Sequence, residues 1–408
     1  MSVRKLVAMI VLLSACNKPP PPPAPAPLPA ISHELGASGH PADLRTLALG
    51  DPAPDFSLPG IDGRNHSLAE FAGADVLMVL FTSNHCPTSH AVEKRLQQLR
   101  QDLRGKPFAM VAINPNHPDG LSIDELGYGR FTDSFADMKP YADSNGWDFP
   151  YLYDGDAQRT ARAYGCLATP HVFVFDSERR LRYSGRFDDS HYADAATVKS
   201  PDARNAVEAL LSGRPVPVAQ TRPHGCSTKW REKLLRARAQ EASWAKLPVV
   251  VEKLDDRGAA ALRANATGKY RLINVWATWC APCREEFPDL VSLSRQFDMR
   301  DFELVTLSMD EAKDEPKVIA YLQKQGAGVS PRVLPGVLAE GRKTNHYLYA
   351  GAGQDALAAS LDDQWPGPIP HTILVAPGGK IIWRHNGALR REDACAAIVE
   401  ALKPYYTP

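Results

Sequence analysis

The sequence lacks an excess of either charge. Its 408 residues include 47 lysines and arginines and 47 aspartates and glutamates, so the formal net charge is zero. No long run of one sign interrupts that balance. Because nucleic acids and acidic surfaces are bound through clustered positive charge, the composition gives no support to a nucleic-acid partner.

The sequence begins without a hydrophobic run long enough to span a bilayer, which takes roughly 20 residues. Its first apolar segment, LVAMIVLL, covers only residues 6–13 and follows Arg4 and Lys5. A positive start before a short apolar stretch is typical of a secretory signal. The segment ends in LSAC at residues 13–16, where the small residues suit a cleavage site.

LSAC resembles the lipobox of bacterial lipoproteins, in which the cysteine receives a diacylglyceryl group and becomes the first mature residue. The resemblance implies a signal peptide over residues 1–16, a lipidated Cys16 and a protein anchored in the bacterial cell envelope, facing the periplasm. Asn17 after the cysteine favours the outer membrane. An ordinary signal peptide with a chance cysteine is the alternative. Residues 17–44 then read as a proline-rich linker, because proline fixes an extended backbone without a core.

The chain also lacks a second pair of cysteines at the spacing of Cys280 and Cys283. Neither another C-x-x-C nor an H-x-x-x-H follows CAPC, which argues against a zinc site and favours a redox dithiol. Apart from Cys16 and this dithiol, four cysteines remain: Cys86, Cys166, Cys226 and Cys395. They can form two disulfides in three ways, and the sequence does not choose between them.

Strand-like and helix-like patterns alternate in both halves of the chain. The expected strands lie at 75–82, 108–114, 171–176 and 180–187, and again at 270–278, 302–309, 371–377 and 380–387. Helices are expected after the first strand of each half and near 132–146, 202–211, 315–325 and 391–403. The alternation predicts an α/β protein with two central mixed sheets, each covered by helices on both faces.

The segment VWATWCAPCREEF places a dithiol where a buried strand ends and a helix begins. Free backbone N–H groups and the positive end of the helix dipole stabilise a thiolate at such a junction. The thiolate is the nucleophile of thiol–disulfide exchange. Cys280 is therefore expected to attack, and Cys283, one turn deeper, to resolve the mixed disulfide.

WATWCAPCREEFP is similar to the active-site segment of thioredoxin-like proteins of the TlpA/ResA type. The resemblance implies a thioredoxin-like domain over 248–408 that exchanges disulfides with protein substrates and an envelope thiol reductant, without a cofactor. It also implies that Pro370 is a cis-proline that packs against the dithiol and orients the substrate chain. The family carries an acidic residue that moves protons, and Glu286 fits better than Glu285 because it lies i+3 from Cys283. A solvated glutamate at the helix start is the alternative reading of Glu286.

The first half resembles the redoxin/peroxiredoxin branch of the same superfamily over residues 45–227, with 228–247 as an interdomain helix and linker. Its segment FTSNHCP resembles an active site of the form F-x-C-N-H-C-P, and Glu93 falls at its expected place. Ser83 replaces the first cysteine of that motif. The fold class implied by both resemblances is two tandem thioredoxin-like domains, of which the first has a single thiol, Cys86, in its motif.

Spacing alone leaves the role of Cys86 open. Cys86 is the fifth residue after Phe81, and Cys280 is the fourth after Trp276, which aligns Cys86 roughly with the attacking thiol. If Ser83-x-x-Cys86 is aligned on the dithiol instead, Cys86 takes the second position. The Ser83 hydroxyl is then placed to donate a hydrogen bond to the thiolate.

Two cysteines are candidates to resolve an oxidised Cys86. Cys166 lies four residues before Pro170, in a loop that passes near the active site in this fold, although a small buried apolar cysteine is the favoured reading. Cys226 lies in HGCSTKW, where the resembling subfamily carries a cysteine. Cys395, in the last helix, reads as a core residue.

The first domain therefore has three interpretations. It is a monothiol redox centre, peroxidase-like or forming mixed disulfides, or a degenerate domain kept as a client-binding scaffold. The third interpretation is a metal site, with copper as the ion. Its ligands would be His85, Cys86, His90 and His171.

Overall fold

The structure is a computed structural model that describes residues 35–402. The predicted signal peptide, the lipidation site Cys16 and residues 17–34 of the predicted linker lie outside the described residues. Among the helices of the described part, none combines the length and the apolar character that crossing a membrane requires.

The first half of the chain forms a five-stranded sheet in the order β5-β4-β3-β7-β8. The strands are β3 (Val76–Phe81), β4 (Phe108–Asn114), β5 (Tyr151–Tyr153), β7 (His171–Phe175) and β8 (Leu181–Gly185). The central strand β3 is parallel to β4 and antiparallel to β7. Its residues VLMVLF are all buried, as an apolar strand covered on both faces requires.

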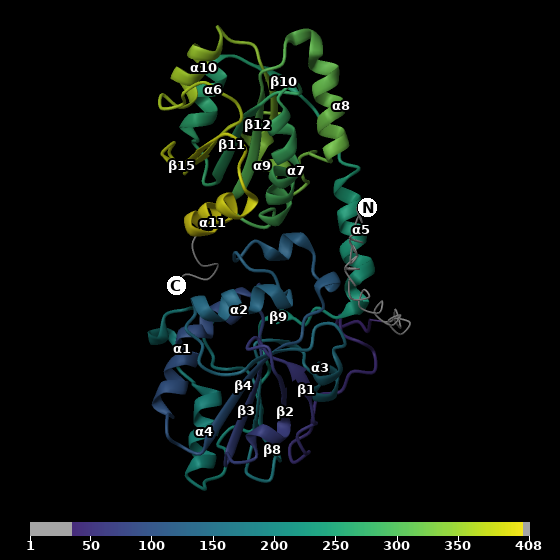
Figure 1. Ribbon diagram of the computed structural model, residues 1–408, viewed down its shortest axis with the longest axis vertical. Coiled ribbons are helices and arrows are strands. Elements are labelled where there is room, and N and C mark those ends of the chain that lie inside the picture. The colour runs from purple at the N-terminus through teal and green to yellow at the C-terminus, as the bar shows by residue number, and fades with distance from the viewer. Residues whose placement is uncertain (1–34, 403–408) are drawn as a thin grey trace, which may run out of the picture. The chain divides into compact units, whose positions relative to one another are not determined.

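Helices and a hairpin cover the two faces of this sheet (Figure 1). On one face, Met78 and Leu80 pack with α1 (Pro87–Asp102), α2 (Phe135–Ser144) and α4 (Asp202–Leu211). On the other, Leu77 and Val79 pack with α3 (Arg159–Tyr164) and with β1 (Ser57–Pro59), which pairs antiparallel with β2 (Asn65–Ser67). The side chains of β3 alternate between the two cores because successive residues of a strand point to opposite faces of the sheet.

The second half forms a six-stranded sheet in the order β10-β13-β12-β11-β14-β15. The strands are β10 (Glu252–Leu254), β11 (Tyr270–Trp276), β12 (Phe302–Ser308), β13 (His346–Tyr349), β14 (His371–Val375) and β15 (Ile381–Asn386). The central strand β11 is parallel to β12 and antiparallel to β14, as β3 is to β4 and β7. The two sheets therefore share one plan, with β10 as an added edge strand.

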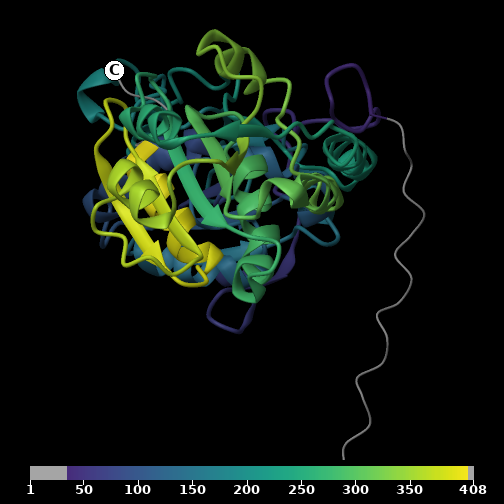
Figure 2. The same cartoon turned by 90° about the horizontal axis from the view of Figure 1, so that it is seen from above.

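Helices again cover both faces of the second sheet (Figures 1 and 2). Leu272 packs with α7 (Ala281–Gln296), α8 (Glu315–Gln325) and α11 (Arg391–Leu402) on one face. Ile273 packs with α6 (Asp256–Ala264) and α10 (Gln354–Leu361) on the other. The remaining helices are α5 (Leu234–Trp244) and α9 (Leu334–Ala339).

The predicted fold class is confirmed: both halves are mixed sheets with helices on both faces. Within the predicted interdomain helix and linker at 228–247, the helix α5 is limited to Leu234–Trp244 and follows the 3₁₀ turn Arg231–Lys233. Short elements without a clear period escaped prediction: β5, α3, β10, α6, α9, β13 and α10.

Candidate active site

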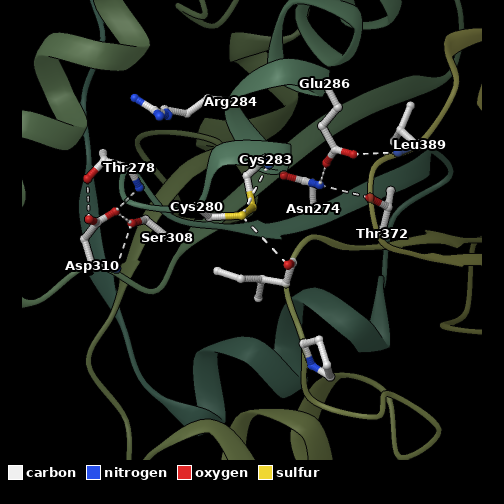
Figure 3. Close-up of a disulfide and its surroundings, with 12 residues drawn as sticks. Asn274, Thr278, Cys280, Cys283, Arg284, Glu286, Ser308, Asp310, Thr372 and Leu389 are labelled. Atoms are coloured by element: carbon white, nitrogen blue, oxygen red, sulfur yellow. Dashed lines mark hydrogen bonds between the residues drawn. A yellow bond between two sulfur atoms is a disulfide. The ribbon is translucent and has the colours of Figure 1, made fainter.

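The dithiol of the second domain lies at the start of α7, directly after the loop that leaves β11. Cys280 is the N-cap residue of α7, and Cys283 is in its first turn. The two sulfur atoms form a disulfide with a bond of 2.02 Å, and the Cys283 N–H lies 3.3 Å from the Cys280 sulfur (Figure 3). A backbone N–H group of the first helical turn therefore points at the sulfur that is predicted to attack.

The surroundings of the disulfide differ between its two ends. Cys283 is fully buried, whereas Cys280 keeps 6% of its surface exposed and follows Trp279, which is 67% exposed. Asp310 holds the loop in place by accepting hydrogen bonds from the Thr278 N–H and hydroxyl, at 2.8 and 2.5 Å (Figure 3). Of the two sulfurs, Cys280 is the one next to the surface.

A cis peptide bond, Ile369–Pro370, lies beside the dithiol. The Ile369 carbonyl oxygen is 3.8 Å from the Cys280 sulfur. Pro370 comes directly before β14, where a residue without an N–H donor is tolerated. The position is the one that the resemblance assigned to Pro370, and its role in orienting a substrate stays a prediction.

Glu286 is buried inside α7, with 3% of its surface exposed, whereas Glu285 is exposed. Its carboxylate accepts hydrogen bonds from the Asn274 side chain at 2.8 Å and from the Leu389 N–H at 2.7 Å (Figure 3). Burial raises the pKa of Glu286 to about 7, against the lowering effect of these two hydrogen bonds. The side chain is therefore not the solvated glutamate of the alternative reading, and it can exchange a proton near neutral pH.

We expect Glu286→Gln to change how stability depends on pH. The carboxyl group of the folded chain holds its proton up to about pH 7, whereas an unfolded chain releases it near its ordinary pKa of about 4.3. The free energy of unfolding therefore falls as the pH rises through this window, by about 4 kcal/mol, and levels off above it. Glu286→Gln should lack this fall in the free energy of unfolding. Chemical denaturation at a series of pH values measures the difference.

Glu285→Gln is the matched control, because Glu285 is the exposed neighbour on the same helix. It should follow the pH dependence of the unchanged chain. A pH dependence of Glu286→Gln that also equals the unchanged chain would contradict the raised pKa.

Cys86 occupies in the first domain the place that Cys280 has in the second. It is the N-cap residue of α1, which like α7 is 16 residues long. The Thr169–Pro170 peptide bond is cis, and the Cys86 thiol donates to the Thr169 carbonyl at 2.9 Å. The Ser89 N–H helps to lower the pKa of the Cys86 thiol, and the Cys283 N–H bonds the Cys280 sulfur. By its place at the helix start, Cys86 aligns with Cys280, the thiol predicted to attack, and Ser89 aligns with Cys283.

Ser83 does not have the role predicted for it. Its hydroxyl bonds the Thr169 hydroxyl at 2.9 Å, and the hydrogen bonds to the Cys86 sulfur come from other groups. The reason is the alignment above: Ser83 belongs to the loop before the helix, not to the turn that holds the sulfur.

Cys226 lies next to Cys86. A short strand, β9 (Cys226–Ser227), pairs antiparallel with β6 (Ala168–Thr169), so that Cys226 stands opposite Thr169. The Cys226 N–H donates to the Cys86 sulfur at 3.4 Å. Cys86 is fully buried, which by itself raises its pKa, yet its pKa lies well below the usual value. The causes are the Cys226 thiol, the charge of His85 and the two backbone N–H groups.

The sulfur of Cys166 has other partners than Cys86. Its sulfur contacts the Ala168 carbonyl and the Thr228 hydroxyl, both at 3.4 Å, and its side chain belongs to the apolar core under the sheet. Burial raises the pKa of this thiol to about 12. The reading of Cys166 as a small buried residue is the one that fits, and Cys395 is likewise buried in the core of the second domain.

The metal site considered for the first domain is not assembled. Within residues 35–402, no three histidine, cysteine, aspartate or glutamate side chains are grouped so that they could hold a metal ion. The three histidines face different partners. His85 bonds Asp133, His90 bonds the Asn84 carbonyl, and His171 contacts the Leu167 N–H and the Ser184 hydroxyl.

Asp133 and Asn116 are two residues of this site that sequence reasoning missed. Both are buried, and Asp133 comes two residues before α2. In the sequence, Asp133 stands beside Ser134 in a polar stretch that predicts only a helix start. Their contact with the Cys86 loop depends on tertiary packing, for which a single sequence holds no signal.

Two family models match this chain, one on each half. Residues 49–184 match the AhpC/TSA family, and residues 243–400 match the Redoxin family. The first match contains Cys86 and Pro170, and the second contains Cys280, Cys283, Glu286 and Pro370.

Relatives of the chain carry names that refer to thiol–disulfide chemistry. The thiol-disulfide oxidoreductase ResA of Bacillus subtilis is 27% identical over 128 residues, which are 31% of this chain and 59% of that protein. The thiol:disulfide interchange protein DsbE homolog of Paracoccus denitrificans is 31% identical over 123 residues, 30% of this chain and 54% of that protein. The chain thus spans somewhat more than half the length of each.

The match with one of the similar solved structures extends over nearly all of that protein. A hypothetical protein of Sinorhizobium meliloti 1021 is 36% identical, with a TM-score of 0.41, over 46% of this chain and 97% of that one.

Proposed function

The chain contains two tandem thioredoxin-like domains, of the AhpC/TSA and redoxin families, and we propose that it is a thiol–disulfide oxidoreductase with two redox centres. The observation that carries this proposal is the disulfide at the start of α7, with Cys280 next to the surface and Cys283 buried. This arrangement supports an attacking thiol and a shielded resolving thiol on one helix.

In the reduced protein, the Cys280 thiolate attacks a disulfide of a protein substrate. A bond forms between Cys280 and one substrate sulfur, and the other substrate sulfur leaves as a thiolate. Cys283 then attacks Cys280, which forms the disulfide seen here and releases the reduced substrate. An envelope thiol reductant returns the two electrons. Glu286, buried in the same helix, is the proposed proton carrier for Cys283.

The second redox centre is Cys86, which we assign to a small oxidant of the peroxide class. Its burial and the backbone of β9 against its sulfur favour a small molecule over a polypeptide disulfide. Attack of the thiolate on the peroxide gives a sulfenic acid, and an alcohol or water leaves. The Cys226 thiol then attacks the sulfenic sulfur, which forms a Cys86–Cys226 disulfide and releases water.

The dithiol of the second domain is the proposed reductant of the Cys86–Cys226 disulfide. Joining two centres on one chain raises their effective concentration to roughly millimolar, without a new binding surface. Electrons then pass from the envelope reductant through Cys280 and Cys283 to Cys86. A lipid anchor at Cys16 is proposed to keep this reaction at the periplasmic side of the bacterial envelope, at the outer membrane.

Disulfide mapping by mass spectrometry tests the proposal. The full chain is reduced, freed of reductant and treated with one equivalent of hydrogen peroxide. We expect a peptide that links Cys86 to Cys226, followed by the Cys280–Cys283 linkage as electrons are passed on. A linkage of Cys86 to Cys166 would contradict the assignment of Cys226. An unreacted Cys86 would favour a scaffold role for the first domain.

A further inference from the structure

A buried network lies directly beside Cys86 and is not used by the reactions above. Asp133 is 1% exposed and accepts four hydrogen bonds. Its Oδ1 receives the N–H groups of Asn84 and His85, at 2.8 and 3.1 Å. Its Oδ2 receives His85 Nδ1 at 2.5 Å and the Asn116 side chain at 2.6 Å.

The four donors keep Asp133 ionised although it is buried. Burial alone raises the pKa of this carboxyl group, but His85 and the hydrogen bonds hold it below its usual value. A carboxylate that accepts on Oδ2 requires a hydrogen on His85 Nδ1. Asp133 therefore fixes both the ring orientation and the tautomer of His85.

The other ring nitrogen of His85 has no partner. His85 is 1% exposed, and its Nε2 is among the buried polar atoms of the described chain without a hydrogen bond. An unpaired buried polar atom costs about 1–3 kcal/mol, so such atoms call for an explanation. With Nδ1 bonded to Asp133, Nε2 is the nitrogen that is free to accept and give a proton.

His85 acts on the reacting sulfur through its charge. It is the residue before Cys86 in the loop that opens α1, and its charge lowers the pKa of the Cys86 thiol. Other titratable groups act on the same site from the elements packed around it. They are His90 and Glu93 on α1, Tyr141 on α2, Glu125 in the 3₁₀ turn Ile123–Leu126, and Cys226 and Lys229 in the β9 segment.

We propose that His85 is a catalytic residue of the first domain, which carries the proton from the Cys86 thiol to the leaving oxygen of a peroxide, and that Asp133 is its positioning residue. This inference rests on the proposed reaction of Cys86 with a peroxide. A buried, unpaired Nε2 on the residue that directly precedes the reacting cysteine, with a buried carboxylate holding the opposite nitrogen, is the arrangement that carries this proposal.

The step balances as follows. The Cys86 thiol proton moves to His85 Nε2, and the thiolate attacks the nearer oxygen of ROOH. The S–O bond forms while the O–O bond breaks, so that sulfur loses two electrons and the peroxide gains them. The proton on Nε2 then goes to the leaving alkoxide. The products are Cys86 sulfenic acid and ROH, and His85 returns to its starting state.

Two reagents with different needs for a proton test this inference on the full, reduced chain. Hydrogen peroxide requires a proton on its leaving oxygen, whereas iodoacetamide releases iodide and requires none. In His85→Gln, whose amide can still donate to Asp133, oxidation of Cys86 at pH 7 should slow by roughly 100-fold. Alkylation of Cys86, measured at a pH where the thiol is fully ionised, should stay within about threefold of the unchanged chain. Mass spectrometry of the Cys86 peptide measures both rates.

Asp133→Asn and His90→Gln complete the set. Asp133→Asn should change the pH profile of the oxidation rate, since the fixed tautomer of His85 is lost, while alkylation at high pH is retained. His90→Gln is the control for a neighbouring histidine whose Nε2 is already bonded, to the Asn84 carbonyl at 2.6 Å, and its oxidation rate should stay within about threefold of the unchanged chain, far from the loss in His85→Gln.

The outcomes separate the inference from the function on which it rests. If Cys86 of the unchanged chain does not react with peroxide, the proposed function of the first domain falls and the inference with it. If it does react, and His85→Gln reacts equally fast, only the inference is overturned. Equal losses of oxidation and alkylation in His85→Gln would also overturn it, because they would mean a purely structural role.

Discussion

Cys280→Ser should lose disulfide exchange, by roughly a thousandfold or more, because the variant has no attacking thiol. Reduction of insulin by the chain in the presence of dithiothreitol measures the loss. Serine is nearly the same size, and Cys280 is an N-cap residue, where a serine is well tolerated. The variant should therefore fold, and its loss of activity should reflect chemistry alone.

Cys283→Ser is the matched variant on the same helix. It keeps the attacking thiol but cannot resolve the mixed disulfide, so it should accumulate as a covalent complex with its substrate. Equal behaviour of the two variants would contradict the assignment of Cys280 as the attacking thiol. Exposure already distinguishes the two sulfurs, since Cys283 is fully buried and Cys280 is not.

Cys280→Ser also tests the proposed relay between the domains. The first reaction of Cys86 with peroxide should keep its rate, because Cys280 takes no part in it. The reaction should then stop after one equivalent of peroxide, with the Cys86–Cys226 disulfide left in place. Continued peroxide consumption under the same reductant would mean that this reductant reaches the first domain directly.

The strands and helices that could be predicted from the sequence are those with a strong pattern. β3 and β11 are apolar runs buried along their length, and α1 and α7 follow them with a helical period. Short elements at the sheet edges, such as β5 and β10 with three residues each, carry too little pattern to be distinguished from loops. Their pairing depends on neighbours that are distant in the sequence.

The candidate site was predictable where one short segment holds all its parts. Cys280, Cys283 and Glu286 lie on one turn and a half of one helix, so their relation follows from helical geometry. The site around Cys86 is built from distant segments, and spacing could not decide its alignment because the loops before α1 and α7 differ in length. Cys226 reaches the Cys86 sulfur across 140 residues, through the pairing of β9 with β6.

Gly225→Ala should slow the formation of the Cys86–Cys226 disulfide by roughly 100-fold, since a misplacement of about 1 Å is enough for such a loss. Gly225 has φ +149, and a Cβ atom there would lie 2.1 Å from the Thr169 carbonyl oxygen. That carbonyl accepts from the Cys86 thiol at 2.9 Å. The added methyl group therefore has to push the β9 segment away from the reacting sulfur.

Gly213→Ala is the matched control for this prediction. Gly213 also has a positive φ, +66, where alanine carries a milder backbone strain than at +149, and a Cβ atom there meets nothing within 4 Å. The time course of the Cys86–Cys226 linkage after peroxide addition, followed by mass spectrometry, compares the two variants. Gly225→Ala should instead accumulate the sulfenic acid of Cys86, because attack on the peroxide forms no bond to Cys226, whereas the linkage does. An unchanged rate of linkage in Gly225→Ala would mean that the close approach of Gly225 to Thr169 does not position Cys226, and that Cys226 reaches Cys86 by another path.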